Sequence, residues 1–280
     1  MGAPLVAVRE NREREPIEAF YPPEAISRPV TAVIHCSPKR DGVIPVTIEL
    51  LCTHRRDTVK IEGRSERLAA DLSVAWAALL ERTRDLRRGE IRDLLTDMPG
   101  REPRLYLMEP YDPRKEPLIM IHGLLDSPLK WANLTNELEA DPSIGRRYQV
   151  WHFLYNTSAP PLYSGRILRT QYRELRRLLD PGLIDPASQR TTLVTHSMGG
   201  IVARGLITDP GDAFWKAAFT RPLPELKLSP ADRTMLQEAF FWQPEPSVRR
   251  VVFIATPHRG SRPCKFFPGC RSFPASTCTA

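Results

Sequence analysis

Ser197 is the residue of this chain best placed to act as a nucleophile. It lies in the segment LVTHSMGG (193–200), between a short apolar run and a stretch that predicts a helix. A serine on a sharp strand-to-helix turn exposes its hydroxyl, and small neighbours let strand and helix approach each other. Gly199 and Gly200 meet that need, whereas Thr195 stands where the G-x-S-x-G pattern has its first glycine. The segment therefore predicts a serine that attacks a carbonyl carbon and carries an acyl group.

A second segment could stabilise the charge that such an attack creates. The sequence IHGLL (121–125) ends an apolar run, and Gly123 precedes Ser197 by 74 residues. The negative oxygen formed in acyl transfer needs two preorganised N–H donors. The residue after the nucleophile supplies one donor, and the loop after an earlier strand supplies the other. We therefore expect the backbone N–H groups of Met198 and Leu124 to form an oxyanion hole.

Alternating strands and helices would position these groups. Buried strands are expected at 117–121, 148–155, 191–195 and 249–255, and helices are expected to begin at Ser127-Pro128 and at Ser164. The second helix has an apolar stripe, with its arginines mostly outside. Such alternation predicts a mostly parallel sheet with helices on both faces, and ligands bind at the carboxyl ends of its strands. His122, His196, Ser197 and His258 are therefore expected near one rim.

The first part of the chain, 1–104, predicts a separate β-rich region. Runs of β-branched residues at 30–34, 46–51 and 58–61 are divided by turn residues, and Asp71 is placed to cap a following helix. Residues 1–20 are rich in charge, and we expect them to lack regular structure. No recognisable chemistry is found in this region.

Three stretches carry a resemblance to a known family: PLIMIHGLL (117–125), HSMGG (196–200) and ATPHRGS (255–261). They resemble the lipase/esterase branch of the α/β-hydrolase family, in particular bacterial hydrolases with an extra N-terminal β-rich region. The resemblance covers 105–262 well and 29–104 more loosely. It implies an α/β-hydrolase fold and a serine, an acid and a histidine in that chain order. Ser197 matches the nucleophile, and Leu124 and Met198 match the oxyanion-hole positions.

The same resemblance also indicates which residues are not catalytic and which expected residues are missing. His122 and His258 match positions that shape loops, not the catalytic base, and no metal or organic cofactor is implied. The 19 residues after Ser261 contain no Asp, Glu or His. We therefore expect the triad acid and base to be absent from this chain, the fold to be incomplete at the C-terminus, and the chain to be nearly inactive. Residues 263–280 are interpreted as an out-of-family tail, as a frameshift or truncated gene model would produce; a genuine short variant is the alternative.

The stretch 209–246 breaks the strand–helix pattern and gathers aromatic residues. It holds six of them, at 214, 215, 219, 240, 241 and 242. It follows the helix after Ser197, a place where such folds insert a lid, so we expect a lid-like insertion over an acyl pocket. Ordinary packing of an additional helix pair is the alternative.

Composition and charge narrow the function classes. The net charge is +7, but the basic residues are spread along the chain rather than clustered, which disfavours nucleic-acid binding. No apolar run is long enough to span a membrane, and no signal peptide is recognised, so the cytoplasm is the default compartment, with peripheral membrane contact left open. The expected partner is a small ester or lipid substrate. A non-catalytic binding protein of the same fold is one alternative; an acyltransferase, thioesterase or amidase is another.

Overall fold

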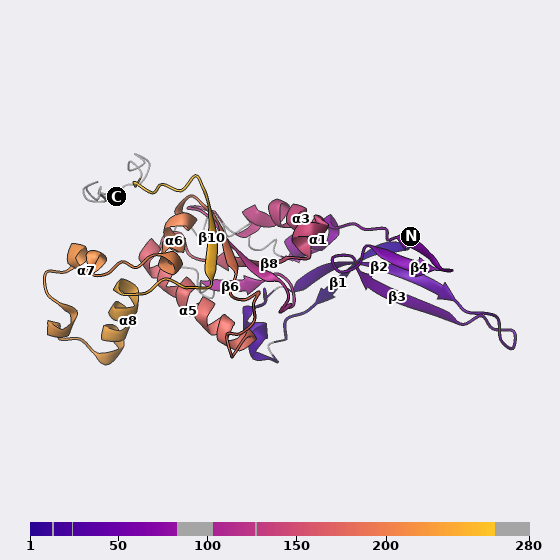
Figure 1. Cartoon of the computed structure of the whole chain (residues 1–280), viewed down its shortest axis with the longest axis horizontal. Helices are drawn as coiled ribbons and strands as arrows, with labels where there is room; N and C mark the ends of the chain where they lie inside the picture. The colour runs from indigo at the N-terminus through magenta and orange to yellow at the C-terminus, as the bar shows by residue number, and fades with distance from the viewer. Residues whose placement is uncertain (13, 24, 83–102, 127, 261–280) are drawn as a thin grey trace.

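The chain forms a mixed α/β body with an elongated β arm at one end (Figure 1). The computed structural model describes residues 1–12, 14–23, 25–82, 103–126 and 128–260. The body holds a five-stranded sheet, and the arm holds a three-stranded antiparallel sheet and a separate two-stranded hairpin. This arrangement confirms the predicted α/β class with a β-rich N-terminal region.

The sheet of the body is mostly parallel. Its strands are β6 (Arg104–Leu107), β7 (Glu116–Ile121), β8 (Tyr148–Leu154), β9 (Thr191–His196) and β10 (Val248–Ile254), in the spatial order β10-β9-β7-β8-β6. Only β6 runs antiparallel to its neighbour. Every residue of β7 is buried, as expected for a central strand covered on both faces.

The strand order creates a switch point beside β7. From β7 the chain adds β8 on one side, then crosses over to add β9 on the other side. Connections that leave neighbouring parallel strands in opposite directions open a crevice at the carboxyl ends of those strands, where ligands of α/β sheets bind. The segments that follow β7 and β9 contain Gly123 and Ser197, so the topology places the two predicted site segments at this crevice.

Helices cover both faces of the sheet. Leu168 and Tyr172 of α5 and Val202 of α6 pack with Ile119 and Leu193 of the sheet in the largest apolar core. Trp131 packs on the opposite face. The helices of the body are the 3-10 helix η2 (Pro128–Trp131), α3 (Ala132–Ala140), α4 (Pro142–Gly145), α5 (Pro161–Leu179), α6 (Met198–Ile207), α7 (Ala213–Ala218), η3 (Leu223–Glu225) and α8 (Pro230–Phe240).

Arg169 departs from the expected outward face of α5. Its side chain is buried, and its guanidinium donates to the carbonyl oxygen of Gly205 at 3.1 Å and to that of Glu238. The same group lies over the Trp242 ring, 4.9 Å from the centroid. The segment 209–246 covers this arginine through Glu238 and Trp242, and the period of α5 alone could not indicate this.

The β arm has one covered face. Its elements are β1 (Ala3–Arg9), β2 (Ile26–Cys36), β3 (Val46–Cys52), β4 (Thr58–Ile61), β5 (Arg64–Arg67) and the helix α1 (Ser73–Arg82) at its root. The 3-10 helix η1 (Pro16–Phe20), between β1 and β2 in the sequence, packs instead on the core of the body. Val33 and Leu51 of the sheet pack with Val59 of β4 and Leu68. Asp71 caps α1 as predicted, accepting from the backbone N–H groups of Ser73 and Val74.

The expectation that residues 1–20 lack regular structure is wrong. Ala3–Arg9 forms β1, which pairs antiparallel with β2 through seven aligned residue pairs. The physical reason is non-local. The hydrogen-bond partners of β1 lie on β2, in a register that runs from Arg9 opposite Ile26 to Ala3 opposite Ala32, and the composition of β1 does not reveal that partner strand.

Buried charges join the arm to the body. Arg28 of β2 contacts Glu109 at 2.6 Å and Glu139 at 3.4 Å, and its guanidinium also lies 2.9 Å from Nδ1 of His54. Lys115 contacts Glu109 at 3.1 Å. Burial, with Arg28 nearby, lowers the pKa of His54 to about 3, so this imidazole is neutral and accepts a hydrogen bond from Arg28.

Candidate active site

Ser197 adopts the strained backbone that a nucleophile on a strand-to-helix turn requires. Its φ is 51° and its ψ is −122°, a region that non-glycine residues rarely occupy. The backbone N–H of Ser197 donates to the carbonyl oxygen of Ile254 at 2.9 Å, and the Ser197 carbonyl accepts from Gly200 N–H at 3.1 Å. Strand β9 ends at His196 and helix α6 begins at Met198, so the turn consists of this one residue.

Two glycines allow the turn to approach the end of β7. A Cβ atom on Gly199 would lie 2.5 Å from the carbonyl oxygen of Ile121, a distance that no side chain tolerates. A Cβ on Gly123 would lie 3.0 Å from the Ser197 Cβ and 2.8 Å from Nδ1 of His196. The absence of both side chains therefore brings the segment after β7 into direct contact with the serine turn.

Thr195 fits the position of the missing first glycine. Its side chain is fully buried, and its hydroxyl donates to the carbonyl oxygen of Val252 on β10 at 3.1 Å. A threonine is acceptable here because its hydroxyl gains a hydrogen-bond partner across the sheet instead of being buried without one.

His122 and Tyr155 hold the loop that follows β7. Tyr155 donates from its hydroxyl to the His122 carbonyl oxygen at 2.7 Å and from its backbone N–H to Nε2 of His122 at 3.4 Å. The two rings stack at 4.3 Å. Because Nε2 accepts, the ring proton is assigned to Nδ1, which donates to the Gly123 carbonyl oxygen at 3.1 Å.

Burial keeps His122 neutral. It lowers the pKa of His122 to about 4, although the hydrogen bond to Gly123 and the charge of Asp126 act in the opposite direction. A fully buried, neutral imidazole with both ring nitrogens engaged is suited to shaping a loop and not to accepting a proton from Ser197. This is the role that the sequence resemblance implies for His122.

The two expected oxyanion-hole donors come from segments that meet at the crevice. Met198 is the first residue of α6, where backbone N–H groups lack partners within the helix and carry partial positive charge. Leu124 follows Gly123, and the next residue, Leu125, has a φ of 57° and donates its N–H to the Thr157 hydroxyl at 3.3 Å. Their joint action on one oxygen stays a prediction.

The other histidines near the rim have other partners. Nδ1 of His258 lies 3.1 Å from the Arg204 guanidinium, and its ring meets Phe253 edge-on at 4.6 Å. His196 lies against Gly123, with its Nδ1 buried and lacking a hydrogen-bond partner in the described part of the chain. Among the described residues, no histidine nitrogen or carboxylate forms a hydrogen bond with the Ser197 hydroxyl. The expectation for 263–280 lies outside the described residues.

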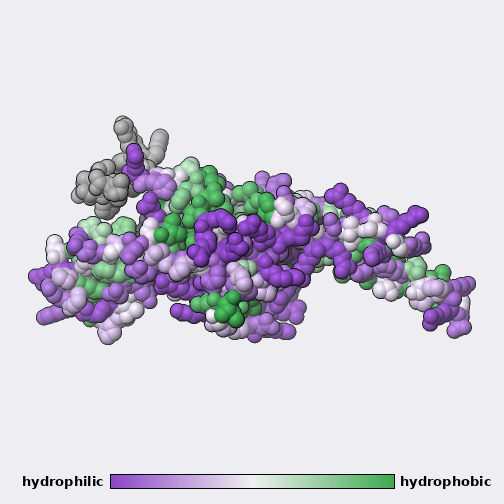
Figure 2. Space-filling model, viewed as in Figure 1, coloured by the Kyte–Doolittle hydropathy of each residue, from purple (hydrophilic) through white to green (hydrophobic). Residues whose placement is uncertain are grey.

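Apolar side chains surround this rim. Leu124 and Leu125 are about half exposed, and so are Val252 and Ile254 of β10, an edge strand of the described sheet. Figure 2 shows hydrophobic surface around β10.

Within the described ranges, no group of three or more His, Cys, Asp and Glu side chains could hold a metal ion, and no helix is long and apolar enough to cross a membrane.

The segment 209–246 is attached to the end of α6, and Ser197 precedes the beginning of that helix. Gln243 donates to the Asp209 carboxylate at 2.9 Å, and Glu245 N–H donates to the carbonyl oxygen of Leu206 at 2.7 Å. Trp215 is the centre of its aromatic cluster, which includes Phe219, Phe240 and Phe241. In Figure 1 this segment lies at the end of the molecule opposite the β arm. Its function as a lid stays a prediction.

Sequence reasoning did not find the residues that fix the site's loop. Tyr155 and Thr157 follow β8, the third strand whose carboxyl end borders the crevice. The signal that could have found them was their position directly after a strand, because ligands of parallel sheets bind at the carboxyl ends of the strands. Neither residue belongs to a recognisable motif.

Comparison with known proteins gives a distant similarity. No protein-family profile and no curated protein matches the chain. The mature form of the lipase BlEst2 from Bacillus licheniformis is 20% identical, with a TM-score of 0.34, over 58% of this chain and 51% of that chain. The propeptide form is 19% identical, with a TM-score of 0.34, over 57% of this chain and 27% of that chain. The chain therefore spans about half the length of the mature lipase.

Proposed function

We propose that Ser197 is the nucleophile of a serine hydrolase that cleaves carboxylic esters. The observation that carries the proposal is the Ser197 backbone, held at φ 51° and ψ −122° between β9 and α6. Strain of this kind costs about 1–3 kcal/mol and persists where a function requires the geometry. Exposed apolar residues at the rim, Leu124, Leu125 and Ile254, favour an acyl chain over a polar group as the substrate's acid part.

The chemistry would proceed in two steps. Ser197 Oγ forms a bond to the carbonyl carbon, and the carbonyl oxygen gains negative charge that the N–H groups of Met198 and Leu124 stabilise. Collapse of this intermediate breaks the bond to the leaving alkoxide and gives an ester on Ser197; water carries the proton lost by the Ser197 hydroxyl to the alkoxide, which departs as the alcohol. Water then attacks that ester and releases the acid, which regenerates the serine.

The proton of the Ser197 hydroxyl has no base within the described residues. Loss of the triad histidine costs about 10⁶ in turnover in a well-studied serine protease, and the oxyanion hole and binding alone retain roughly 10³–10⁴ over water. We therefore propose that this chain retains only the residual activity and that both acylation and deacylation are slow.

Hydrolysis of p-nitrophenyl butyrate by the full chain tests this proposal. We expect slow release of p-nitrophenol that Ser197→Ala removes, while Ser37→Ala on the exposed β2–β3 turn leaves it unchanged. A rate that Ser197→Ala does not lower would contradict the assignment of the nucleophile. A rate typical of a complete triad, lost in Ser197→Ala, would keep the nucleophile and overturn the claim that no base is present.

A non-catalytic binding protein is the second candidate, and the absence of a base at Ser197 among the described residues favours it. The same N–H groups would then bind a carboxylate without reaction. Calorimetric titration with butyrate, together with the p-nitrophenyl butyrate assay, separates the two candidates. If the chain is a binding protein, both the wild type and Ser197→Ala should bind butyrate. The wild type should then release p-nitrophenol no faster than Ser197→Ala does.

A further inference from the structure

The three-stranded sheet of the arm has an apolar face that the described chain leaves bare. In the register of the sheet, Leu5 pairs with Val30, Ile34 with Ile48, and Leu50 with Ala32. Paired residues of an antiparallel sheet point to the same side, and this side alternates with the one that holds Val33 and Leu51. Ile34, Ile48 and Leu50 are 62%, 64% and 61% exposed.

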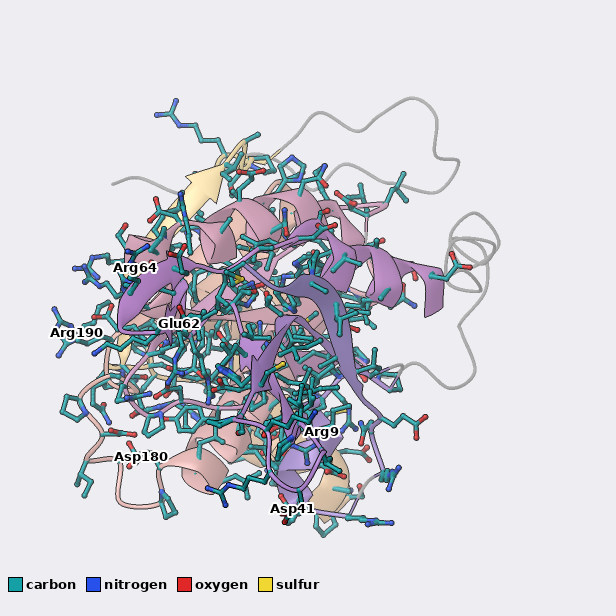
Figure 3. The ribbon with its side chains drawn as sticks, turned by 90° about the vertical axis from the view of Figure 1, so that its right-hand side faces the viewer. Arg9, Asp41, Glu62, Arg64, Asp180 and Arg190 are labelled. Carbon is teal, nitrogen blue, oxygen red and sulfur yellow. The ribbon has the colours of Figure 1, made fainter. Side chains whose placement is uncertain are left out.

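The opposite face of the same sheet is covered, so the exposure is one-sided. Val33 and Leu51 are buried against Val59 of β4 and Leu68. Figure 3 looks along the arm and separates the β2–β3 turn, marked by Asp41, from the β4–β5 turn, marked by Glu62 and Arg64. The β4–β5 hairpin therefore leaves the second face uncovered.

The apolar face continues to the tip of the arm, where basic residues join it. Val43 and Ile44 are exposed beside Lys39 and Arg40 in the β2–β3 turn. From 26 to 67, the arm carries eight Lys and Arg residues against five Asp and Glu residues. Figure 1 shows this tip as the point of the molecule farthest from the body, and Figure 2 shows hydrophobic surface on the arm behind a hydrophilic tip.

The area of the face argues against a second copy of the chain as its main occupant. Three strands about 4.8 Å apart, with seven residues that each rise about 3.3 Å, cover roughly 300 Å². A stable protein–protein interface needs about 800 Å² on each partner. A lipid surface has no such threshold, because it adapts to the apolar side chains and adds attraction between anionic headgroups and nearby Lys and Arg.

We propose that this face, formed by Leu5, Ile34, Val46, Ile48 and Leu50 with the basic β2–β3 turn, binds an anionic lipid surface. The apolar side chains enter the boundary between headgroups and acyl chains, and Lys39 and Arg40 contact the headgroups. This binding does not depend on Ser197 and would deliver the chain to a lipid phase whether or not the chain cleaves esters.

Co-sedimentation of the full chain with vesicles tests the proposal. We expect binding to vesicles of phosphatidylcholine and phosphatidylglycerol that weakens at high salt and in pure phosphatidylcholine. The variant Ile34→Glu/Ile48→Glu should lower the bound fraction at least tenfold, and Lys39→Glu/Arg40→Glu should remove the preference for anionic vesicles. Ile184→Glu is the matched control, since Ile184 is 83% exposed on a loop after α5 and should bind as the wild type does.

Three outcomes would overturn the proposal. One is wild-type chain that stays in the supernatant with anionic vesicles. Another is an equal loss of vesicle binding in Ile184→Glu and in Ile34→Glu/Ile48→Glu, which would indicate nonspecific adsorption of apolar side chains. The third is a wild-type dimer by light scattering that Ile34→Glu/Ile48→Glu dissociates while vesicle binding is absent, which would identify a second copy as the occupant.

A fluorescent label tests the same face without the glutamate substitutions. An environment-sensitive dye on the exposed Cys36, in a background with the other cysteines changed to serine, should shift its emission to shorter wavelength on vesicles.

Discussion

Gly123 and Ser197 lie so close that a Cβ atom on Gly123 would stand 3.0 Å from the Cβ of Ser197. Strands β7 and β9 are neighbours in the sheet, and each of these residues comes just after its strand. The contact joins the loop that would supply one oxyanion-hole donor to the turn that carries the hydroxyl. The candidate site beside β7 would therefore depend on two segments that must be in register with each other.

The first prediction concerns this contact. Gly123→Ala should destabilise the fold by about 1–3 kcal/mol, because the new methyl group meets Ser197, His196 and a backbone oxygen within 3.2 Å. Urea unfolding measures the change. Gly182→Ala is the control: its nearest neighbours, side-chain atoms of Ile184, lie 3.5 Å away or more, and its stability should change little or increase. Equal stability of the two variants would contradict the close contact.

The second prediction concerns the backbone of Ser197. Ser197→Gly should be more stable than Ser197→Ala by about 1 kcal/mol, because glycine adopts φ 51° without the cost that a Cβ atom imposes. Both variants remove the hydroxyl, so the comparison isolates the backbone. The measurement is the free energy of unfolding in urea for each variant. If alanine is as stable as glycine, the turn is not strained.

The third prediction concerns Tyr155 as a residue that positions the loop 122–125. Tyr155→Phe removes the bond to the buried His122 carbonyl oxygen and should cost about 1–3 kcal/mol. Amide hydrogen exchange at Leu124 and Leu125 should become faster in this variant. Tyr163→Phe, on the exposed side of α5, should alter neither quantity. Unchanged exchange in Tyr155→Phe would show that the loop is held by other contacts.

The fourth prediction concerns acid stability. Burial lowers the pKa of His122 to about 4 and that of His54 to about 3, below the ordinary value of 6.5. Between pH 6.5 and 4 the unfolded chain therefore binds more protons than the folded chain, and stability falls as pH falls. Each such histidine contributes a slope of up to about 1.4 kcal/mol per pH unit.

Urea unfolding at several pH values checks this slope. His54→Asn should make the loss of stability between pH 6.5 and 4 shallower, because asparagine has no proton to gain. A steeper loss in His54→Asn than in the wild type would contradict the neutral, buried state of His54.

The sequence allowed the body of the fold to be predicted because its strands are locally distinctive. The runs 117–121 and 191–195 are short and rich in branched residues, the run 148–155 is rich in aromatic residues, and the three match β7, β9 and β8 closely. The sharp turn at Ser197 was also predictable, since Gly199 in it lies too close to the backbone of Ile121 to carry a side chain.

Other features depend on partners far away in the chain. The first strand, β1, is defined by its pairing with β2, and Arg169 is buried only because Trp242 and Glu238 cover it. Tyr155 holds His122 by two hydrogen bonds and a stacked ring contact, which no sequence motif indicates.

The central claim is that Ser197 can form an acyl-enzyme, and trapping that species tests it most directly. The full chain is incubated with p-nitrophenyl butyrate, quenched in acid, digested and mapped by mass spectrometry. Because no described residue is placed to act as a base in deacylation, we predict a butyryl group that accumulates on the peptide containing Ser197, that is absent from Ser197→Ala and that persists in Ser37→Ala. Butyryl groups found only on lysines, or an equal yield on this peptide in Ser197→Ala, would contradict the account.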